Sequence, residues 1–381
     1  MVFAPSRASD PIRVNMIILG IETSCDETAA AVVRDGTEIL SNVVVSQIDI
    51  FAEYGGVIPE VAARSHLEAM LPVVDKALAD AGCTWRDIDA IAVTHAPGLL
   101  GSLLIGTLTA RTLAILHDKP LYAVHHLKSH VYANWIGTGE SGSAGTPIFP
   151  LLALVVSGGH TQILYMPGHN KFEIIGTTHD DAVGECFDKV AKFLGLPYPG
   201  GPAIAKAALE GDSHRYQLPH PKVEGLDFSF SGLKTAVLRA VQKEVGVPIS
   251  YPSHKLVELL SDEQVADFAA SFQKTAVEIL REKLELALEG HPEVKSVVVA
   301  GGVSANAVLR KVFETLGETA GASDGAAGDA GELMRAYFPA PALSGDNGAM
   351  VAAAAYFEIM SGVEPTDPYR LNIYPRVEIG V

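Results

Sequence analysis

Few cysteines, no cluster of basic residues and no long uncharged apolar run occur in this chain of 381 residues. Cys25, Cys83 and Cys186 are far apart and form no C-x-x-C pair, which argues against a disulfide framework or a thiolate zinc site and favours a reducing cytoplasm. The 28 Lys and Arg against 45 Asp and Glu give a net charge of −17, which argues against unaided binding of nucleic acid. Without an apolar run of about eighteen residues, no membrane span is expected.

The composition is that of a globular protein large enough for two domains, with 48% hydrophobic and 19% charged residues. Residues 1–15 lack the apolar core of a secretion signal, so we expect a loose tail there, with Met16 as a candidate start of translation. Residues 137–147 have linker composition and predict a boundary between two lobes. The Gly/Ala-rich, acidic segment 317–332 predicts a flexible surface insertion.

Two double-glycine turns follow apolar runs of strand length, at 154–161 and 297–306. Such a break lets a phosphate approach backbone N–H groups at the end of a buried strand. A third element at 17–28 places hydroxyls and three acidic groups after a strand, before a return strand at 29–33. The three turns together predict a cleft that holds a nucleotide.

Helix and strand patterns alternate along the chain, which predicts an α/β architecture. The first half has a helical pattern at 60–78, a strand at 88–94, and a glycine loop that feeds a small-residue helix over 98–117. The second half repeats this logic with the following predicted segments: strands from 148 to about 176, helices over 182–194 and 262–288, and a strand over 297–300. We therefore predict two similar lobes that face one cleft.

Two histidines four residues apart form the clearest metal-ligand pattern. On a helix, His126 and His130 would lie on one face within about 5–6 Å and could bind one metal, although surface or capping histidines fit the spacing equally well. Leu127 stands where a zincin protease carries glutamate, which disfavours a metalloprotease. Two imidazoles need an oxygen ligand, and Asp346 precedes a small-residue helix, where capping is its alternative role.

Acidic residues gather at the start of the predicted helix 182–194. Asp180 and Asp181 lie where the helix dipole favours negative charge, so we expect them to cap this helix. Asp188 lies two turns further in and is available to ribose hydroxyls or another ligand. The glycines in the turn 198–202 permit close approach of a ligand. The segment 228–235 fits either a substrate loop or a strand-to-helix turn.

Several motifs occur in a characteristic order between Met16 and the 360s. They lie at 20–28, 54–60, 125–130, 156–161, 228–235, 301–306 and 346–350. Together they resemble the TsaD family, the tRNA adenosine threonylcarbamoyltransferases once labelled O-sialoglycoprotein endopeptidases. The resemblance implies the actin/Hsp70/sugar-kinase (ASKHA) superfold, with two ribonuclease-H-like lobes around a nucleotide cleft. The first lobe would span 16–147 and be completed by 344–372, and the second lobe would span 148–343.

The resemblance also implies a reaction. Threonylcarbamoyl adenylate binds in the cleft, and its threonylcarbamoyl group passes to the exocyclic amine of the adenosine just 3′ of the tRNA anticodon, with release of AMP. ATP or ADP, with Mg²⁺, is the other expected occupant of the cleft. His126, His130 and Asp346 would ligate iron(II), with zinc as the competing ion, and this metal would act as a Lewis acid and template.

Further site residues follow from the motifs. The phosphate or acyl region would be held by Val155, Val156, Ser157, Gly158 and Gly159. The nucleoside would be held by Asp188, Gly201 and Asn306. Asp26 and Glu27 would be the proton acceptors near the attacking amine, with a structural role at the strand turn as the alternative.

The implied partners are tRNA, a paralogous helper subunit of the TsaB type and a small P-loop ATPase of the TsaE type, with the adenylate supplied by a separate enzyme. An acidic chain fits this scheme, because the assembly would grip the tRNA. Ala96 departs from the family pattern Thr-x-Gly-Pro-Gly-Leu, so we assign that loop no ligand contact. An actin-like ATPase or small-molecule kinase and an idle scaffold are the alternatives, although a kinase has no need of a His–His–Asp set.

Overall fold

Two mixed sheets of five strands, one in each half of the chain, form the framework of the protein. The computed structural model describes residues 15–137, 145–314, 316 and 334–379. Nearly all of the expected N-terminal tail, most of the linker and the expected insertion at 317–332 lie outside the described residues. The expectations for these segments therefore stay predictions.

The first sheet consists of β1 (Ile17–Glu22), β2 (Glu27–Arg34), β3 (Glu38–Ser46), β4 (Ala90–Ala96) and β5 (Leu121–His125). Its order is β3-β2-β1-β4-β5. The pairs β1–β2 and β2–β3 are antiparallel, whereas β1–β4 and β4–β5 are parallel.

The second sheet repeats this pattern with β6 (Leu151–Val156), β7 (Thr161–Gly168), β8 (Lys171–Thr177), β9 (Ser296–Ala300) and β10 (Arg335–Tyr337). Its order is β10-β9-β6-β7-β8, so β6 takes the place of β1 and β9 the place of β4. The antiparallel and parallel pairs correspond as well. The predicted repetition of one lobe by the other is confirmed.

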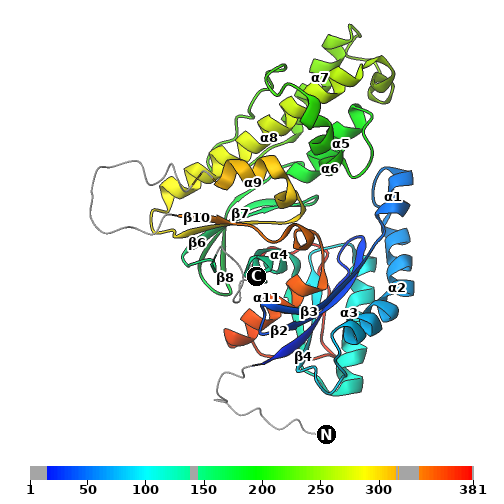
Figure 1. Ribbon diagram of the computed structural model, residues 1–381, viewed down its shortest axis with the longest axis vertical. Helices are drawn as coiled ribbons and strands as arrows, with labels where there is room; N and C mark the ends of the chain where they lie inside the picture. Colours follow the sequence, from blue (N-terminus) through cyan, green and yellow to red (C-terminus); the bar gives the residue numbers. More distant parts are fainter. Residues whose placement is uncertain (1–14, 138–144, 315, 317–333, 380–381) are drawn as a thin grey trace.

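Ten α-helices surround the sheets in the part of the chain that the structure describes. They are α1 (Ile48–Tyr54), α2 (Pro59–Asp80), α3 (Leu100–His117), α4 (His126–Tyr132), α5 (Val183–Phe193), α6 (Gly200–Ala207), α7 (Ser231–Glu244), α8 (Asp262–Gly290), α9 (Ala307–Glu314) and α11 (Gly348–Met360). Five of them, α2, α3, α5, α8 and α11, correspond to the helices expected from the sequence. Figure 1 shows α5 to α9 around the second sheet in the upper half and α2 and α3 against the first sheet below.

Strand β6 shows how the sheets divide the core, because its side chains alternate between two faces. Leu152 and Leu154 belong to the core formed with the helices of the upper half. Leu151 and Ala153 belong to a second core, which α4 and α11 share with both sheets. Helices α4 and α11 thus lie between the two sheets (Figure 1). Helix α4 carries His126 and His130, and Asp346 lies two residues before α11.

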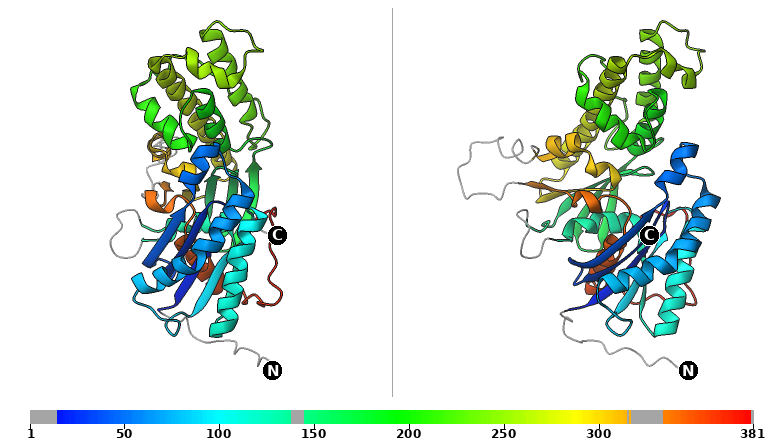
Figure 2. Two further views of the ribbon diagram at one scale, coloured as in Figure 1. Left: turned by 90° about the vertical axis from the view of Figure 1, so that its right-hand side faces the viewer. Right: turned by 45° about the vertical axis from the view of Figure 1, so that its right-hand side comes forward.

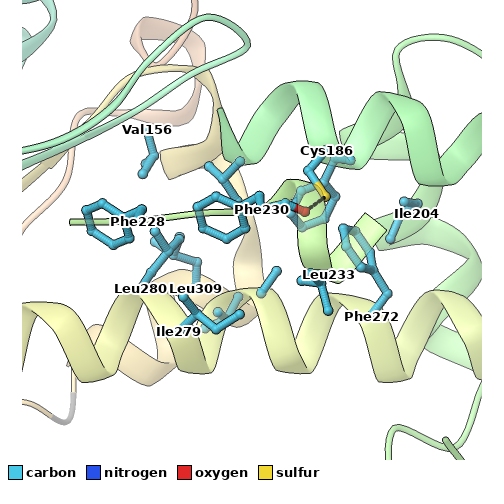
Figure 3. Close-up of a cluster of buried hydrophobic side chains, with 14 of the residues drawn as sticks. Val156, Cys186, Ile204, Phe228, Phe230, Leu233, Phe272, Ile279, Leu280 and Leu309 are labelled. Carbon is cyan, nitrogen blue, oxygen red and sulfur yellow. Dashed lines mark hydrogen bonds between the residues drawn. The ribbon is translucent and has the colours of Figure 1, made fainter. Parts of the chain in front are cut away.

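The core of the upper half supports the strand ends of the second sheet. Figure 3 shows Phe228 and Phe230 between Val156 at the end of β6 and the side chains of α8. The thiol of Cys186 donates to the carbonyl oxygen of Phe230 at 3.6 Å, and burial raises the pKa of this thiol to about 12. Cys186 therefore has a structural role.

Helix α3 is the one described helix with the length and apolar composition to cross a membrane. Core helices of other proteins meet the same criterion, so this is weak evidence for a span. The helix packs on α2 and β4, with Leu103 and Ala110 buried, while Leu100 and Leu116 are exposed.

Helix α11 lies very close to β1 because the residues at their contact, Gly20 on β1 and Gly348 and Ala352 on α11, have small side chains or none. A Cβ on Gly20 would meet the carbonyl oxygen of Gly348 and lie 2.6 Å from the nitrogen of Ala352, both backbone atoms that cannot move aside. We expect Gly20→Ala to lower the free energy of unfolding by about 3 kcal/mol or more, as for other overpacked cores. Urea unfolding measures this change.

The matched control is Gly290→Ala at the end of α8, where a Cβ meets no atom within 4 Å. Alanine there is expected to be neutral or stabilising by up to about 1 kcal/mol. Equal stability of the Gly20→Ala and Gly290→Ala proteins would contradict the close approach of α11 to β1.

Candidate metal and nucleotide site

Helix α4 places both candidate histidine ligands on one buried face. Strand β5 runs directly into α4, and Nδ1 of His125 accepts the N–H of Leu127 at 3.3 Å, which caps the helix. His126 and His130 are 7% and 2% exposed, and their ring centroids are 4.6 Å apart. A role as surface histidines, which the spacing left open, is therefore excluded.

Asp346 joins the two histidines from the loop before α11. Its Oδ1 lies 3.1 Å from Nε2 of His130 and 3.6 Å from Nε2 of His126. Helix α11 is capped by Asn347 instead, whose Oδ1 accepts the N–H of Met350 at 3.0 Å. The alternative role of Asp346 as a helix cap is therefore wrong, and its carboxylate faces the histidines.

The three side chains fit a divalent transition metal. Their ligand atoms all lie within 4.8 Å of one another. Ligand atoms about 2.1 Å from one ion lie roughly 3.0–3.4 Å apart at octahedral or tetrahedral angles. The observed spacings of 3.1 and 3.6 Å are close to this range. Two imidazoles and one carboxylate suit iron(II), zinc or manganese.

Opposite charges compensate one another in this cluster. Burial opposes ionisation of Asp346, but His126 and His130 outweigh it and hold the pKa of the carboxyl below its usual value. Burial likewise opposes protonation of His126, yet the charges of Asp346 and Glu22 raise its pKa. A metal ion must displace the imidazole proton, so metal uptake is expected to release protons.

The turn between β1 and β2 brings two more carboxylates to the cluster. Asp26 lies in this turn and Glu27 is the first residue of β2, where it accepts a hydrogen bond from the hydroxyl of Ser46 at 3.1 Å. Burial, followed by the charges of Asp346 and Asp26, raises the pKa of Glu27 to about 10. The acidic turn of the first lobe and Asp346 therefore share one electrostatic environment.

Buried His66 on α2 supports this turn from behind. Its Nε2 donates to the carbonyl oxygen of Cys25 at 2.9 Å, and its Nδ1 accepts from the hydroxyl of Thr28 at 2.8 Å. Burial lowers the pKa of His66 below its usual 6.5, despite opposing contributions from Cys25 and nearby carboxylates. The folded protein therefore favours the neutral form of this imidazole more than the unfolded chain does.

A pH dependence of stability follows from His66. As the pH falls through 6.5, the unfolded chain protonates this residue more readily than the folded chain does, so stability is expected to fall as the pH decreases. This residue contributes up to about 1.4 kcal/mol per pH unit. Urea unfolding of the intact chain and of His66→Gln across this range should show a shallower dependence for the variant. Parallel curves would contradict this role of His66.

The loop after β6 forms the part of the site that the sequence assigns to phosphate. Val155 and Val156 are fully buried in the sheet, so their side chains face the cores. Ser157 closes the loop, because its N–H donates to the carbonyl oxygen of His160 at 2.8 Å and its Oγ accepts the N–H of His160 at 3.1 Å. A Cβ on Gly158 or Gly159 meets no atom within 4 Å, which leaves this backbone open to a phosphate.

Two glycines bring β9 and α5 onto this loop. Gly301 has a φ of 90°, and a Cβ there would lie 2.5 Å from the carbonyl oxygen of Val156. A Cβ on Gly184 would lie 2.6 Å from the carbonyl oxygen of Ser157. Only glycine permits both approaches. Because β6 and β9 are parallel neighbours, both double-glycine turns lie at the same edge of the second sheet.

Asp188 and Gly201 lie together at the N-terminus of α6. Oδ1 of Asp188 accepts the N–H of Gly200 at 2.7 Å, and a Cβ on Gly201 meets no atom within 4 Å. Burial raises the pKa of Asp188. Burial, followed by the charges of Asp26 and Asp188, also raises the pKa of Tyr198. Tyr198 therefore lies near the acidic groups of both lobes.

Asn306 is engaged within the second lobe. Its Oδ1 accepts the N–H groups of Val308 and Leu309 at 3.0 and 3.1 Å, at the start of α9. Its Nδ2 donates to Oε1 of Gln273 at 2.7 Å. A contact between Asn306 and a nucleoside stays a prediction, because the amide oxygen caps the helix.

The expected caps of α5 act elsewhere. The N-cap of α5 is Ala182, which makes no side-chain hydrogen bond. Asp180 accepts the N–H of Phe230 at 2.8 Å, and Asp181 binds Nζ of Lys234 at 2.6 Å. The expectation that these aspartates cap α5 is wrong. Asp180 holds the backbone at the start of α7, and Asp181 pairs with the side chains of Lys234 on α7 and of Lys189 on α5, at 2.7 Å, rather than with backbone N–H groups of α5. The segment before α7 is thus held as a strand-to-helix turn, one of the two structures the sequence left open.

Three further residues, Glu22, Ser24 and His160, lie near the cluster, and no role was expected for them from the sequence. Oε2 of Glu22 and Oγ of Ser24 lie 3.3 and 3.2 Å from Nδ1 of His126. Burial, followed by the charges of His126 and His130, lowers the pKa of His160 to about 4. The available signal for Glu22 was a carboxylate at the end of an otherwise apolar strand.

The fold and this cluster define a two-lobed protein of the ASKHA superfold with a His–His–Asp cluster that could hold a metal ion. The solved structure of T. kodakarensis HypF has a similar fold, with a TM-score of 0.56 at 16% identity over 93% of this chain and 49% of that chain. The sequence matches the TsaD family, tRNA N6-adenosine threonylcarbamoyltransferase, over residues 38–353. The chain belongs to this family.

Similar proteins carry the same description over nearly their full length. The tRNA N6-adenosine threonylcarbamoyltransferase of Symbiobacterium thermophilum is 47% identical over 366 residues, which cover 96% of this chain and 97% of that protein. The protein of the same name from Thermomicrobium roseum is 46% identical over 91% of this chain and 93% of its own length. The family and fold expected from the sequence motifs are confirmed.

Proposed function

We propose that this chain transfers the threonylcarbamoyl group of threonylcarbamoyl adenylate to the exocyclic amine of the adenosine 3′ of the tRNA anticodon, with release of AMP. The cluster of His126, His130 and Asp346 carries this proposal, because a kinase of the same superfold would hold Mg²⁺ through oxygen ligands and water. Family membership supports the identity of the acyl group and of the acceptor.

His126, His130 and Asp346 would hold one divalent metal, which we propose to be iron(II), with zinc as the competing ion. When bound, the metal supplies Lewis-acid polarisation of a carbonyl or phosphoryl oxygen. The chain contributes a buried, preassembled set of ligands whose charges already compensate one another. Mg²⁺ would accompany ATP or ADP when either takes the place of the adenylate.

The adenylate would lie between the acidic turn of the first lobe and the glycine loops of the second. The backbone of Gly158 and Gly159 would receive its phosphate or acyl region, and Asp188 and Gly201 its nucleoside. The open space over these glycines supports this placement. The side chains of Val155, Val156, Ser157 and Asn306 would shape the loops that hold the nucleotide.

Attack of the adenosine amine on the carbamoyl carbon forms a C–N bond, expels AMP and requires removal of an N–H proton. We assign this proton to Asp26 and Glu27 acting together as one general base, because Glu27, whose pKa is raised to about 10, already holds a proton at neutral pH. The two carboxyl groups are hydrogen-bonded to each other, so a proton taken up by one is shared by the pair. Ser46 and His66 hold the turn that carries them.

The lobes would be divided at the linker, with 16–147 and 344–372 in the first lobe and 148–343 in the second. The packing of α11 on β1 and β2 supports the return of the C-terminal segment to the first lobe. We propose that the protein acts in the cytoplasm with tRNA, a TsaB-type helper subunit and a TsaE-type P-loop ATPase, and that a separate enzyme supplies the adenylate.

We assign the helper subunit to an apolar face of the first lobe. Figure 2 shows α2 and α3 side by side along this lobe, and the two helices pack against each other. Exposed apolar side chains gather on them: Leu67, Leu71, Leu100, Leu104, Leu108, Ile115 and Leu116. A helper subunit with the same fold would offer an equivalent pair of helices to cover them.

The nucleotide product tests the proposed reaction. With preformed threonylcarbamoyl adenylate, partner subunits and tRNA, we expect AMP to be released in proportion to acceptor tRNA. The matched control is the same tRNA with guanosine in place of the adenosine, which should release no AMP. Release of ADP from ATP without any dependence on this adenosine would instead support a kinase or ATPase.

A further inference from the structure

Glu22, the last residue of β1, presents a buried carboxylate to the candidate metal site from behind. The residue is fully buried. Its Oε2 lies 3.3 Å from Nδ1 of His126 and accepts the hydroxyl of Thr94 at 2.5 Å. Its Oε1 accepts the N–H of Ser24 at 2.5 Å. Both oxygens of the carboxylate therefore have partners. One of these partners is Nδ1 of His126, the ring nitrogen on the side of the imidazole away from Asp346.

We propose that Glu22 is the positioning residue that prepares His126 to bind the metal. This inference rests on the metal site within the proposed function and deepens it. A carboxylate that accepts the Nδ1 proton fixes the imidazole in the tautomer whose Nε2 carries a lone pair. Nε2 of His126 is the atom that faces Oδ1 of Asp346, at 3.6 Å.

Nδ1 of His126 has hydrogen-bond partners, among them Glu22, whereas Nδ1 of His130 has none among the described residues. Nδ1 of His130 is buried and has no hydrogen-bond partner among the described residues. Nδ1 of His126 has both Glu22 and the hydroxyl of Ser24. The orientation of one ligand is thus fixed by hydrogen bonds, and that of the other by packing and by Asp346. Metal affinity should depend on Glu22 accordingly.

A purely structural role would not require a charged group at this position. Burial of an ionised carboxylate is unfavourable unless it is paired and hydrogen-bonded. The neighbouring strand residues Ile18, Leu19 and Ile21 are all buried and apolar, so an apolar side chain would be the ordinary occupant. Glu22 also holds the N–H of Ser24, and the test must separate that contact from the one to His126.

The test is the affinity of the full-length, metal-free chain for Zn²⁺, measured by competition with a chromophoric chelator, for the intact sequence and for Glu22→Gln. Glutamine keeps the size of the side chain and can still accept from Ser24, but it removes the charge that orients His126. We expect the Kd for Zn²⁺ to rise roughly 10- to 100-fold. The Co²⁺-loaded protein should show the same ranking, with altered visible absorption in the variant.

The matched control is Glu358→Gln, because Glu358 is also buried but pairs with Lys128 on the far side of α4. Its Kd for Zn²⁺ should stay within about twofold of the intact chain. An unchanged Kd in a folded Glu22→Gln protein, or an equal loss in Glu358→Gln, would overturn the inference. Circular dichroism confirms that each variant is folded.

Two further results keep the inference testable. If Glu22→Gln does not fold, Glu22→Asp retains the charge but withdraws it from His126, and the same rise in Kd is expected. In the Zn²⁺-loaded intact chain, ¹⁵N NMR should show His126 protonated at Nδ1, and the opposite tautomer would overturn the inference. Failure of the intact chain to bind metal would count against the metal site of the proposed function, whereas equal binding by both chains counts only against the role of Glu22.

Discussion

Replacing Asp346 with alanine is expected to abolish tight metal binding and to slow threonylcarbamoyl transfer on the order of a thousandfold. The substitution removes the carboxylate of the proposed metal site and the opposing charge that lies 3.6 Å from His126 and 3.1 Å from His130. Lewis-acid stabilisation is worth several kcal/mol, and about 1.4 kcal/mol corresponds to a tenfold change in rate. Metal content and single-turnover transfer measure the two effects.

The matched control is Glu289→Ala, which removes an exposed carboxylate in the last turn of α8. This protein should retain its metal and its rate. A metal-free Asp346→Ala protein that still transfers at the rate of the intact chain would show that the cluster is structural. Full support of tRNA modification in cells by Asp346→Ala would favour the idle-scaffold alternative.

Replacing Glu27 with glutamine is expected to lower the transfer rate roughly 10²- to 10⁴-fold, the usual contribution of a general base. Glutamine preserves the hydrogen bond from Ser46 but cannot take part in the proton exchange with Asp26. Metal affinity should change little, because Glu27 is not a ligand of the cluster. The rate is measured in a single turnover with preformed adenylate and saturating tRNA.

A lower transfer rate with an unchanged metal affinity would distinguish a catalytic role of Glu27 from a structural one. A collapse of the turn would weaken metal binding and the thermal stability together with the rate. Glu289→Gln serves as the control for the chemical change alone. A Glu27→Gln protein with normal transfer would contradict the assignment of a catalytic role to Glu27 and support its alternative role at the strand turn.

Local sequence signals predicted the parts of the fold that depend on neighbouring residues. The long helix expected at 262–288 is observed as Asp262–Gly290, and it begins with a capping box in which Ser261 and Gln264 bind each other's backbone N–H groups. The strand expected at 297–300 is observed as Ser296–Ala300. Periodicity, caps and glycines lie within a few positions of the elements they determine.

Side-chain contacts between residues far apart in the sequence could not be predicted from such local signals. The expected capping role of Asp180 and Asp181 was wrong because these side chains bind Phe230 and Lys234, which are 50 and 53 residues away. Asp181 also binds the side chain of Lys189 on α5, and not a backbone N–H of that helix. Helix α11 is capped by Asn347 and not by its neighbour Asp346. A sequence pattern does not locate the first residue of a helix to within one position, so it could not distinguish the two. Periodicity predicts which residues form a helix, but not which side chain turns toward its first N–H groups.

The candidate site shows the same division. The pair His126 and His130 could be found from its spacing, since both residues lie on one short helix. Asp346 is 220 and 216 residues away from them by number, and it could be suggested only from the need of two imidazoles for an oxygen ligand and from the family resemblance. Glu22 was overlooked because its contact with His126 joins residues 104 apart, across two strands of the first sheet. No local pattern marks such a contact.

The central claim is tested most directly by the nucleosides of tRNA incubated with labelled threonine, ATP, bicarbonate, the adenylate-forming enzyme, the partner subunits and either the intact chain or its His126→Ala form. The account predicts labelled threonylcarbamoyladenosine with the intact chain and almost none with His126→Ala. Equal labelling by both chains would contradict the role of the metal site. No labelling by the intact chain, in a mixture that works with another family member, would contradict the proposed transfer itself.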